Sequence, residues 1–132
     1  IIGRKKGLPN DINRTVKIIE KKTKHNKKIT LNIALNYGSK EEIVNACKGL
    51  IKLSNNKISM QNFEKKLYTK NMPDPDILIR TGGTKRLSNF LLWQLAYSEI
   101  FFINKLWPDF NENDFGRIIR KYKKIKRNFG KI

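Results

Sequence analysis

Ile77 to Ile79 form a short, uninterrupted apolar run that stands between prolines and glycines. Pro73 and Pro75 precede the run, and Gly82 and Gly83 follow it. An apolar residue at every position is typical of a strand that is covered on both faces, as strands are when helices flank a parallel sheet. The run therefore favours a parallel sheet.

Helical and strand-like segments alternate along the rest of the chain. One helix is expected from the turn at residues 8–11 to about residue 25, and another over residues 59–68. Three more helices are expected to begin at Ser39, Ser88 and Asn111. Strands are expected at residues 29–37 and 100–103. This alternation implies right-handed crossovers and an α/β fold, with a mostly parallel sheet sandwiched by helices. The sequence shows no internal repeat, linker or second domain.

Apolar residues at helical spacing predict which side of each helix turns inward. The helix from Ser39 has a capping box with Glu42. The expected inward residues are Ile43, Val44, Cys47, Leu50 and Ile51 in that helix, and Phe115, Ile118, Ile119, Tyr122 and Ile125 in the last one. Trp93, Tyr97, Trp107 and the phenylalanines are expected to fill the core rather than bind a ligand.

The chain carries a formal net charge of +18, which suggests a polyanionic partner. Nucleic acid, an acidic membrane surface and phosphorylated substrates all qualify. The excess lies mostly at residues 17–28 and 117–131. A general bias toward lysine, isoleucine and asparagine explains much of it more simply, because many lysines then cover solvated helix faces. We favour this simpler explanation for most of the lysines.

Other residue types exclude several classes of protein. Cys47 is the single cysteine, so the chain has no disulfide framework or thiolate metal site, and His25 has no metal-binding partner nearby in sequence. The longest apolar stretch, residues 90–103, is too short and too polar to cross a bilayer. We expect a soluble, cytoplasmic protein. Because the sequence begins with Ile1 inside an apolar segment, we also expect it to be the downstream part of a longer protein.

Two arginines, a serine and a glycine pair surround the end of the expected strand at residues 77–79. Arg80 lies at the carboxyl end of that strand, where ligands collect in open parallel sheets. Glycines permit tight turns and close approach of backbone amides to a ligand, and Arg86 and Ser88 precede an expected helix N-terminus. Each arginine alone is more often a solvated residue, but together these donors suit a diphosphate better than a carboxylate.

Glu99 lies between a mostly apolar expected helix and the strand at residues 100–103. A carboxylate that is partly removed from water needs a partner. A Mg²⁺ ion shared with a diphosphate would serve, and so would a salt bridge to Arg80 or Arg86. Both alternatives stay open. Residues 36–38 close another expected strand and could form a wall of the same cleft.

The segment DILIRTGGTKRLSNFLLWQLAYSEIFFINKLWPDF resembles the C-terminal signature of the cis-prenyltransferases, in particular the bacterial undecaprenyl diphosphate synthases, or isoprenyl transferases. Residues 30–38 and the closing RNFG are similar to other segments of that family. The resemblance spans most of the chain, and its long signature is far more specific than a glycine motif. It implies that residues 1–132 are the C-terminal portion of a single cis-prenyltransferase domain.

The resemblance implies a transferase that condenses isopentenyl diphosphate with an allylic diphosphate, in the presence of Mg²⁺, to make a cis-polyprenyl diphosphate. It implies that Arg80, Arg86 and Ser88 bind the diphosphate of isopentenyl diphosphate and that Glu99 contacts Mg²⁺. It also implies a homodimer and, through the lipid product, peripheral contact with a membrane.

The sequence departs from the family at two important places. The family's catalytic aspartate belongs to a DGNGRWA segment that does not occur here, so no catalytic residue is assigned and the chain alone is expected to be inactive. Where the family commonly has an arginine that reaches the substrate of a partner subunit, this chain has Asn128; the preceding Arg127 is not assigned that role. Ser39 and Lys40 replace a glycine-arginine pair.

Two alternatives to an enzyme portion remain. The charge alone would fit a basic nucleic-acid-binding domain, but no aromatic RNA-binding pattern, KH loop or zinc spacing accompanies it. A noncatalytic partner subunit of a prenyltransferase is less consistent with the sequence, because Arg80, Arg86 and Ser88 are all retained. We therefore expect no nucleic acid among the partners.

Overall fold

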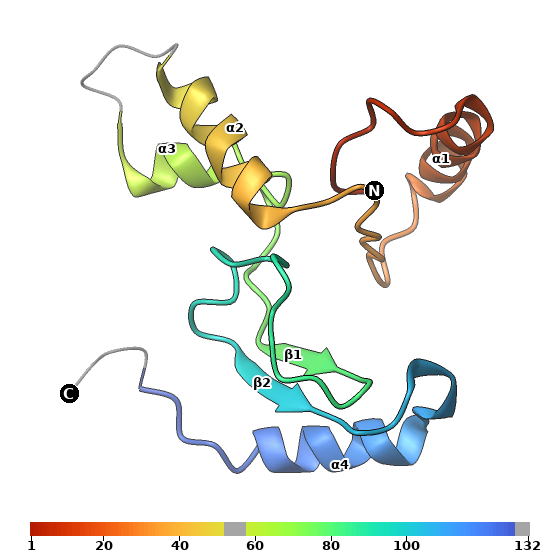
Figure 1. Ribbon diagram of the computed structural model, residues 1–132, viewed down its shortest axis with the longest axis vertical. Helices are drawn as coiled ribbons and strands as arrows, with labels where there is room; N and C mark the ends of the chain where they lie inside the picture. The colour runs from red at the N-terminus through yellow and green to blue at the C-terminus, as the bar shows by residue number, and fades with distance from the viewer. Residues whose placement is uncertain (52–57, 129–132) are drawn as a thin grey trace. The chain divides into compact units, whose positions relative to one another are not determined.

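A computed structural model describes residues 1–51 and 58–128 (Figure 1). The chain divides into two compact units, Ile1–Met72 and Pro73–Ile132, which are described separately below. The division falls at Pro73 and Pro75, the prolines that punctuate the sequence before the apolar run. Assignment of all 132 residues to one domain stays a prediction. None of the described helices is long and apolar enough to span a membrane.

The first unit begins with helix α1, Asn10–Thr23, which confirms the predicted helix. Pro9 precedes it with a φ of −53°, a value that suits the entry to a helix. Asp11 in the first turn and lysines in the last turn complement the helix dipole. Only Val16 is buried in this helix, and Ile12, Ile18 and Ile19 are exposed together with its charged residues.

Helix α2, Ser39–Ile51, starts where the sequence predicted but buries a different face. Its buried residues are Ser39, Glu42, Ala46 and Leu50, whereas Val44, Cys47 and Ile51, predicted to point inward, are exposed. The reason is the Glu42 carboxylate. It accepts a hydrogen bond from the Tyr37 hydroxyl at 2.6 Å and another from the Tyr68 backbone N–H at 2.7 Å, so a polar residue faces the interior.

Helix α3, Met60–Glu64, is shorter than the predicted helix over residues 59–68. Ser59 caps it by accepting a hydrogen bond from the backbone N–H of Asn62 at 3.2 Å. Phe63 and Leu67 are buried in this unit, although Leu67 lies beyond the end of the helix.

The predicted strand at residues 29–37 is wrong for most of its length. An isolated parallel bridge pairs Ile2 with Ala34, and the side chains of Ile29 and Leu31 are 84% and 79% exposed. A strand forms only where a neighbour satisfies its backbone groups. Here Ile2 and Arg4 bond to residues 33–36, and within residues 1–51 and 58–128 no ladder forms along the first half of the segment.

The second unit contains two parallel strands, which confirms the predicted strands and their direction. Strand β1, Ile77–Arg80, pairs with β2, Glu99–Phe102, with Ile77 opposite Glu99 and Arg80 opposite Phe102. A short 3-10 turn, η2 at Trp107–Asp109, leads into helix α4, Glu112–Tyr122. Helix α4 runs alongside β2 (Figure 1), and the two elements enclose a cavity that is described below.

The helix predicted from Ser88 does not form. Residues 88–97 make a series of turns, with φ angles of +50° at Ser88, +62° at Asn89 and +44° at Leu91. Left-handed backbone at these positions interrupts the ladder of helical hydrogen bonds. The anion site therefore has no helix N-terminus after Ser88, contrary to the prediction.

The aromatic residues are less buried than predicted. Trp107 is 73% exposed and stacks on Phe110, and Tyr97 and Phe115 are also exposed. Ile118 is the buried apolar residue of α4. The prediction that the aromatics fill the core is therefore wrong for Trp107, Tyr97 and Phe115.

Asp114 holds the start of α4 in place. Its side chain, 4% exposed, accepts hydrogen bonds from Lys105 Nζ at 2.8 Å, from the backbone N–H of Asn111 and from the Arg117 guanidinium. Asn111 caps the helix in return, by accepting from the backbone N–H of Asp114. These bonds lower the pKa of Asp114 from 3.8 to about 2, and the bond from Lys105 has the largest effect. Burial of the carboxyl acts in the opposite direction and raises its pKa.

This low pKa predicts a loss of stability in acid. A carboxyl whose pKa is depressed in the folded state stabilises the fold above its ordinary pKa, and the contribution disappears as the pH falls from about 4 to about 2. Thermal melts followed by circular dichroism in this window should show a smaller acid dependence for Asp114→Asn than for the wild type. Asp109→Asn, at an exposed position nearby, should behave as the wild type does. Identical acid dependence in both variants would contradict this role for Asp114.

Candidate functional site

The glycine turn after β1 is anchored to the segment that follows β2. Gly82 and Gly83 have φ angles of +85° and +73°, the left-handed region that favours glycine. The Gly82 N–H donates to the carbonyl of Lys105 at 2.8 Å, and the Gly83 N–H donates to that of Ile103 at 3.0 Å. The turn is present as predicted, but its two amides are engaged within the protein and do not serve a ligand.

Arg80 is held at the carboxyl end of β1 by the loop that follows. Its Nε donates to Thr84 Oγ1 at 2.8 Å, and its Nη1 donates to Ser88 Oγ at 2.9 Å and to the carbonyl of Arg86. The structure therefore brings together Arg80, Arg86 and Ser88, three of the four residues that the sequence proposed for the site. Thr84 was missed.

Arg80, Arg86 and Ser88 line a cavity of about 380 Å³ in the second unit. Its lining residues are Leu78, Ile79, Arg80, Thr81, Arg86, Leu87, Ser88 and Phe90. Two of them are cationic and none is acidic, so the cavity has an uncompensated positive charge. Its apolar residues are Leu78 and Ile79 from β1 and Leu87 and Phe90 on either side of Ser88, so the cavity has two cationic residues beside an apolar wall.

The donors of the cavity are poised for an anion. In the part of the chain that the structure describes, the Arg86 side chain has no hydrogen bond or ion pair, and Arg80 keeps Nη2 without a partner. Ser88 Oγ accepts from Arg80, which leaves its own proton available to donate. Two guanidinium groups and a hydroxyl thus offer several directed donors, the arrangement that suits phosphate oxygens.

Glu99 does not join this cluster. It is the first residue of β2, opposite Ile77, whereas Arg80 is opposite Phe102. Three positions along a strand correspond to roughly 10 Å, and an odd separation places the two side chains on opposite faces of the sheet. Within residues 1–51 and 58–128, no salt bridge links Glu99 to either arginine, so that alternative is wrong.

A complete Mg²⁺ site is not formed by the described residues. Among residues 1–51 and 58–128, no group of three His, Cys, Asp or Glu side chains could hold a metal ion. Glu99, half-buried at the start of β2, supplies one carboxylate. The described residues therefore do not make up a metal centre on their own.

Arg127 is committed to contacts within the second unit. Its Nη1 donates to an Asp76 carboxylate oxygen and to the Tyr122 hydroxyl, and its Nη2 donates to the carbonyl of Tyr97 at 3.0 Å. The hydrogen bond between Arg127 and Asp76 lowers the pKa of the Asp76 carboxyl and raises the pKa of the Arg127 guanidinium. These contacts hold the Arg127 guanidinium against Asp76, Tyr122 and Tyr97. Asn128 is exposed, and the rest of the closing RNFG lies outside the described residues.

The residues proposed as a wall, 36–38, lie in the first unit. Asn36 donates its side-chain amide to the carbonyls of Arg4 and Lys6, and Tyr37 donates to Glu42. Their part in the cleft stays a prediction.

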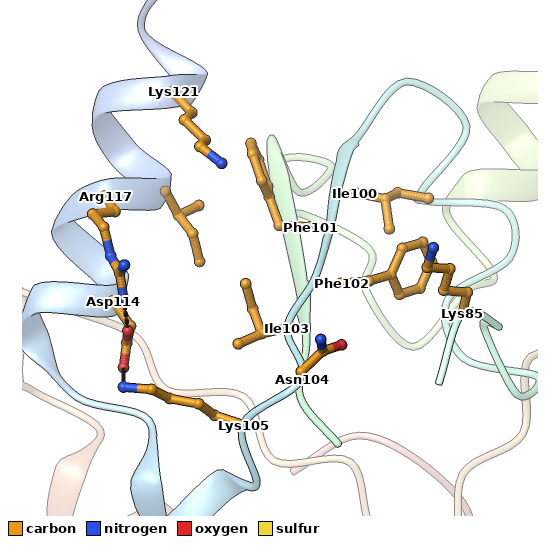
Figure 2. Close-up of a pocket in the computed structure, with 11 residues that line it drawn as sticks. Lys85, Ile100, Phe101, Phe102, Ile103, Asn104, Lys105, Asp114, Arg117 and Lys121 are labelled. Atoms are coloured by element: carbon orange, nitrogen blue, oxygen red, sulfur yellow. Dashed lines mark hydrogen bonds and ion pairs between the residues drawn. The ribbon is translucent and has the colours of Figure 1, made fainter. Parts of the chain in front are cut away.

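A second cavity, of about 480 Å³, lies between β2 and α4 (Figure 2). Ile100 and Phe102 extend to one side of β2, and Phe101 and Ile103 to the other. Lys105 and Arg117 flank Asp114 at its edge, where both are joined to that carboxylate. Asp114 thus engages two of the four cationic residues of this cavity, whereas Lys85 and Lys121 form no ion pair within residues 1–51 and 58–128.

The second unit is an α/β arrangement in which two parallel strands end beside a doubly cationic cavity, whose charge suits a phosphorylated ligand. The chain belongs to the family whose model is described as "Putative undecaprenyl diphosphate synthase", which matches residues 1–130. The sequence resemblance to cis-prenyltransferases is thereby confirmed.

Individual relatives agree with this assignment. The chain is 46% identical over 132 residues to the isoprenyl transferase of Fusobacterium nucleatum and 48% identical over 134 residues to that of Thermotoga maritima. These matches cover 100% and 98% of this chain, but only 57% and 58% of the two relatives. The chain therefore spans little more than half the length of these proteins.

Two solved structures are similar to the chain, each at 36% identity over 98% of its length. The crystal structure of a probable undecaprenyl diphosphate synthase from Campylobacter jejuni gives a TM-score of 0.87, with 61% of that chain covered. That of lavandulyl diphosphate synthase from Lavandula x intermedia, in complex with dimethylallyl diphosphate, gives 0.94, with 58% covered. These similarities confirm the predicted α/β fold.

Proposed function

We propose that this chain provides the isopentenyl diphosphate site of a cis-prenyltransferase that makes a cis-polyprenyl diphosphate such as undecaprenyl diphosphate. The observation that carries the proposal is the convergence of Arg80, Arg86 and Ser88 on one cavity without a carboxylate. Family membership supplies the reaction class, and the cavity supplies donors for a diphosphate beside an apolar wall for a short hydrocarbon.

In the proposed reaction, the double bond of isopentenyl diphosphate attacks the allylic carbon of the second substrate. The bond from that carbon to its diphosphate breaks, the diphosphate leaves with the bonding electrons, and a proton is lost from the isopentenyl unit. Arg80 and Ser88 would hold the diphosphate of isopentenyl diphosphate, which this step retains, and Arg86 would add a second positive charge. Fixing that end limits the motion of the attacking double bond.

Two further elements of the proposal, the metal ion and the assembly, rest on the family resemblance, and a third rests on the sequence. Mg²⁺ would neutralise diphosphate charge, with Glu99 as one ligand and the remaining ligands from outside the described residues. The active protein would be a cytoplasmic homodimer. Because the DGNGRWA segment does not occur in this sequence, the 132-residue chain would bind isopentenyl diphosphate without turning it over.

Calorimetric titration of the chain with isopentenyl diphosphate tests the proposal. We expect saturable binding that inorganic diphosphate displaces and that isopentenol, which lacks the charged group, does not. A parallel titration with single-stranded RNA separates the nucleic-acid alternative, for which binding should be steeply salt-dependent. Failure to bind isopentenyl diphosphate, with tight binding of RNA, would overturn the proposed function in favour of that alternative.

We also propose that α4 and the residues after it make the peripheral membrane contact that a polyprenyl product implies. Arg117, Arg120, Lys121, Lys123 and Lys124 surround one surface hollow without any acidic residue. Arg120 and Lys121 lie three and four positions after Arg117, which places these residues along one stripe of α4, and Lys123 and Lys124 follow its last residue, Tyr122. A basic stripe of this kind is complementary to an anionic lipid surface.

Sedimentation with vesicles tests this contact. Reversing Arg120, Lys123 and Lys124 to glutamate should reduce binding to vesicles that contain phosphatidylglycerol at least about a hundredfold, since each basic residue near such a surface contributes about 1 kcal/mol. Reversing Lys17, Lys21 and Lys22, which are exposed in α1, changes the net charge equally and should have a much smaller effect. Equal losses in both variants would show that net charge, and not α4, governs the binding.

A further inference from the structure

We infer that Thr84 is a positioning residue that sets the orientation of the Arg80 guanidinium for a diphosphate; this inference rests on the proposed function. Thr84 Oγ1 accepts the Nε–H of Arg80 at 2.8 Å in a partly buried hydrogen bond. Thr84 does not line the cavity, whereas Arg80 does. Its hydroxyl therefore acts on a ligand through Arg80 and not by direct contact.

The position of Thr84 is fixed by the loop that carries it. The preceding Gly83 donates its N–H to the carbonyl of Ile103 at 3.0 Å, and Gly82 donates to that of Lys105. These bonds join the loop to the segment after β2. Strand β2 in turn pairs with β1, the strand that carries Arg80. Both partners of the Thr84–Arg80 bond thus belong to one hydrogen-bonded framework, and a β-branched side chain such as threonine has few rotamers to explore.

The hydrogen bond determines which donors remain for a ligand. A guanidinium group has five N–H donors in one plane. Thr84 takes the donor on Nε, while Ser88 and the carbonyl of Arg86 are contacted by Nη1. Nη2 is left over, in the part of the chain that the structure describes. Without the bond to Thr84, rotation about the side-chain torsions would move these donors away from Ser88.

A hydroxyl suits this task because it is neutral. It fixes the plane of the guanidinium group and leaves its full positive charge for the ligand. No acidic residue in the described ranges forms a salt bridge with Arg80. The arrangement separates orientation, which Thr84 provides, from charge, which Arg80 provides.

Titration of the full 132-residue chain with isopentenyl diphosphate tests the inference. Thr84→Val keeps the shape of the side chain and removes the hydroxyl, and we expect it to raise Kd about tenfold, as for loss of a hydrogen bond to a charged group. Thr84→Ser keeps the hydroxyl and should bind within about twofold of the wild type, well under the change expected for a lost hydrogen bond. In an Arg80→Ala background, Thr84→Val should cause no further loss.

A ligand-free measurement accompanies the titration. Exchange of the Arg80 Nε–H with solvent, followed by NMR, should be slow in the wild type and in Thr84→Ser, and fast in Thr84→Val. Wild-type affinity in Thr84→Val, or an undiminished effect in the Arg80→Ala background, would overturn the role of Thr84 while leaving the proposed function intact. No binding by the wild type would overturn both.

Discussion

Replacement of Arg80 by alanine is expected to raise the Kd for isopentenyl diphosphate about a hundredfold or more. Arg80 lines the cavity and bonds to Ser88, so its loss removes a charged donor and also releases the hydroxyl beside it. Hydrogen bonds to charged groups contribute about 1.5–3 kcal/mol each, and about 1.4 kcal/mol corresponds to a factor of ten. Calorimetric titration of wild type and variant measures the change directly.

Two variants make this result specific. Arg120→Ala removes an equal charge from the exposed surface of α4 and should change the Kd by less than about twofold, as expected for screened surface charge. Arg80→Lys keeps the charge but loses the planar fork, and it should recover only part of the affinity. If Arg80→Ala bound isopentenyl diphosphate as the wild type does, the assignment of Arg80 would be wrong.

Replacement of Glu42 by alanine is expected to lower the free energy of unfolding of the first unit by about 2–4 kcal/mol. The Glu42 side chain is 2% exposed and accepts hydrogen bonds from the Tyr37 hydroxyl and the Tyr68 backbone N–H. Removing the carboxylate takes the acceptor away from both donors in a partly buried region, and also leaves a cavity where the Glu42 side chain was. Urea unfolding followed by circular dichroism would report the loss.

The neighbouring Glu41 provides the control. Its carboxylate forms an exposed salt bridge with Arg4 at 3.3 Å, and such pairs contribute less than about 1 kcal/mol. Glu41→Ala should therefore unfold close to the wild type. Equal stability of the Glu41→Ala and Glu42→Ala proteins would refute the structural role given to Glu42.

The parts of the fold that could be predicted are those that depend on short stretches of sequence. The run at Ile77 to Ile79 is apolar at every position, and it forms strand β1, which pairs in parallel with β2. The helices at Asn10 and Asn111 follow clear start signals and are also correct. In each case the residues that determine the element lie within it or at its end.

Other parts depend on distant residues and could not be predicted. Residues 29–37 have the composition of a strand, yet a strand needs a partner along its length, and Ile2 reaches only the second half. The buried face of α2 is set by Glu42, whose partner Tyr68 lies 26 residues away. The stretch after Ser88 has an apolar helical pattern, but the left-handed backbone at Asn89 and Leu91 interrupts it.

The candidate site was largely predictable because its residues are close in sequence. Arg80, Arg86 and Ser88 lie within nine positions, and a single tight turn brings them together. Thr84 was missed since a threonine in a loop carries no signal of its own; only its distance from Arg80 Nε reveals its part. The engagement of the glycine amides by Ile103 and Lys105 was likewise invisible in the sequence.

A crystal structure of the chain with isopentenyl diphosphate tests the central claim most directly. We predict that the diphosphate lies in the cavity at the end of β1, with oxygens within hydrogen-bonding distance of Arg80, Arg86 and Ser88, and with the isopentenyl group against the apolar wall. A diphosphate bound instead along α4, among Arg120, Lys123 and Lys124, with the cavity at Arg80 empty, would contradict the assignment.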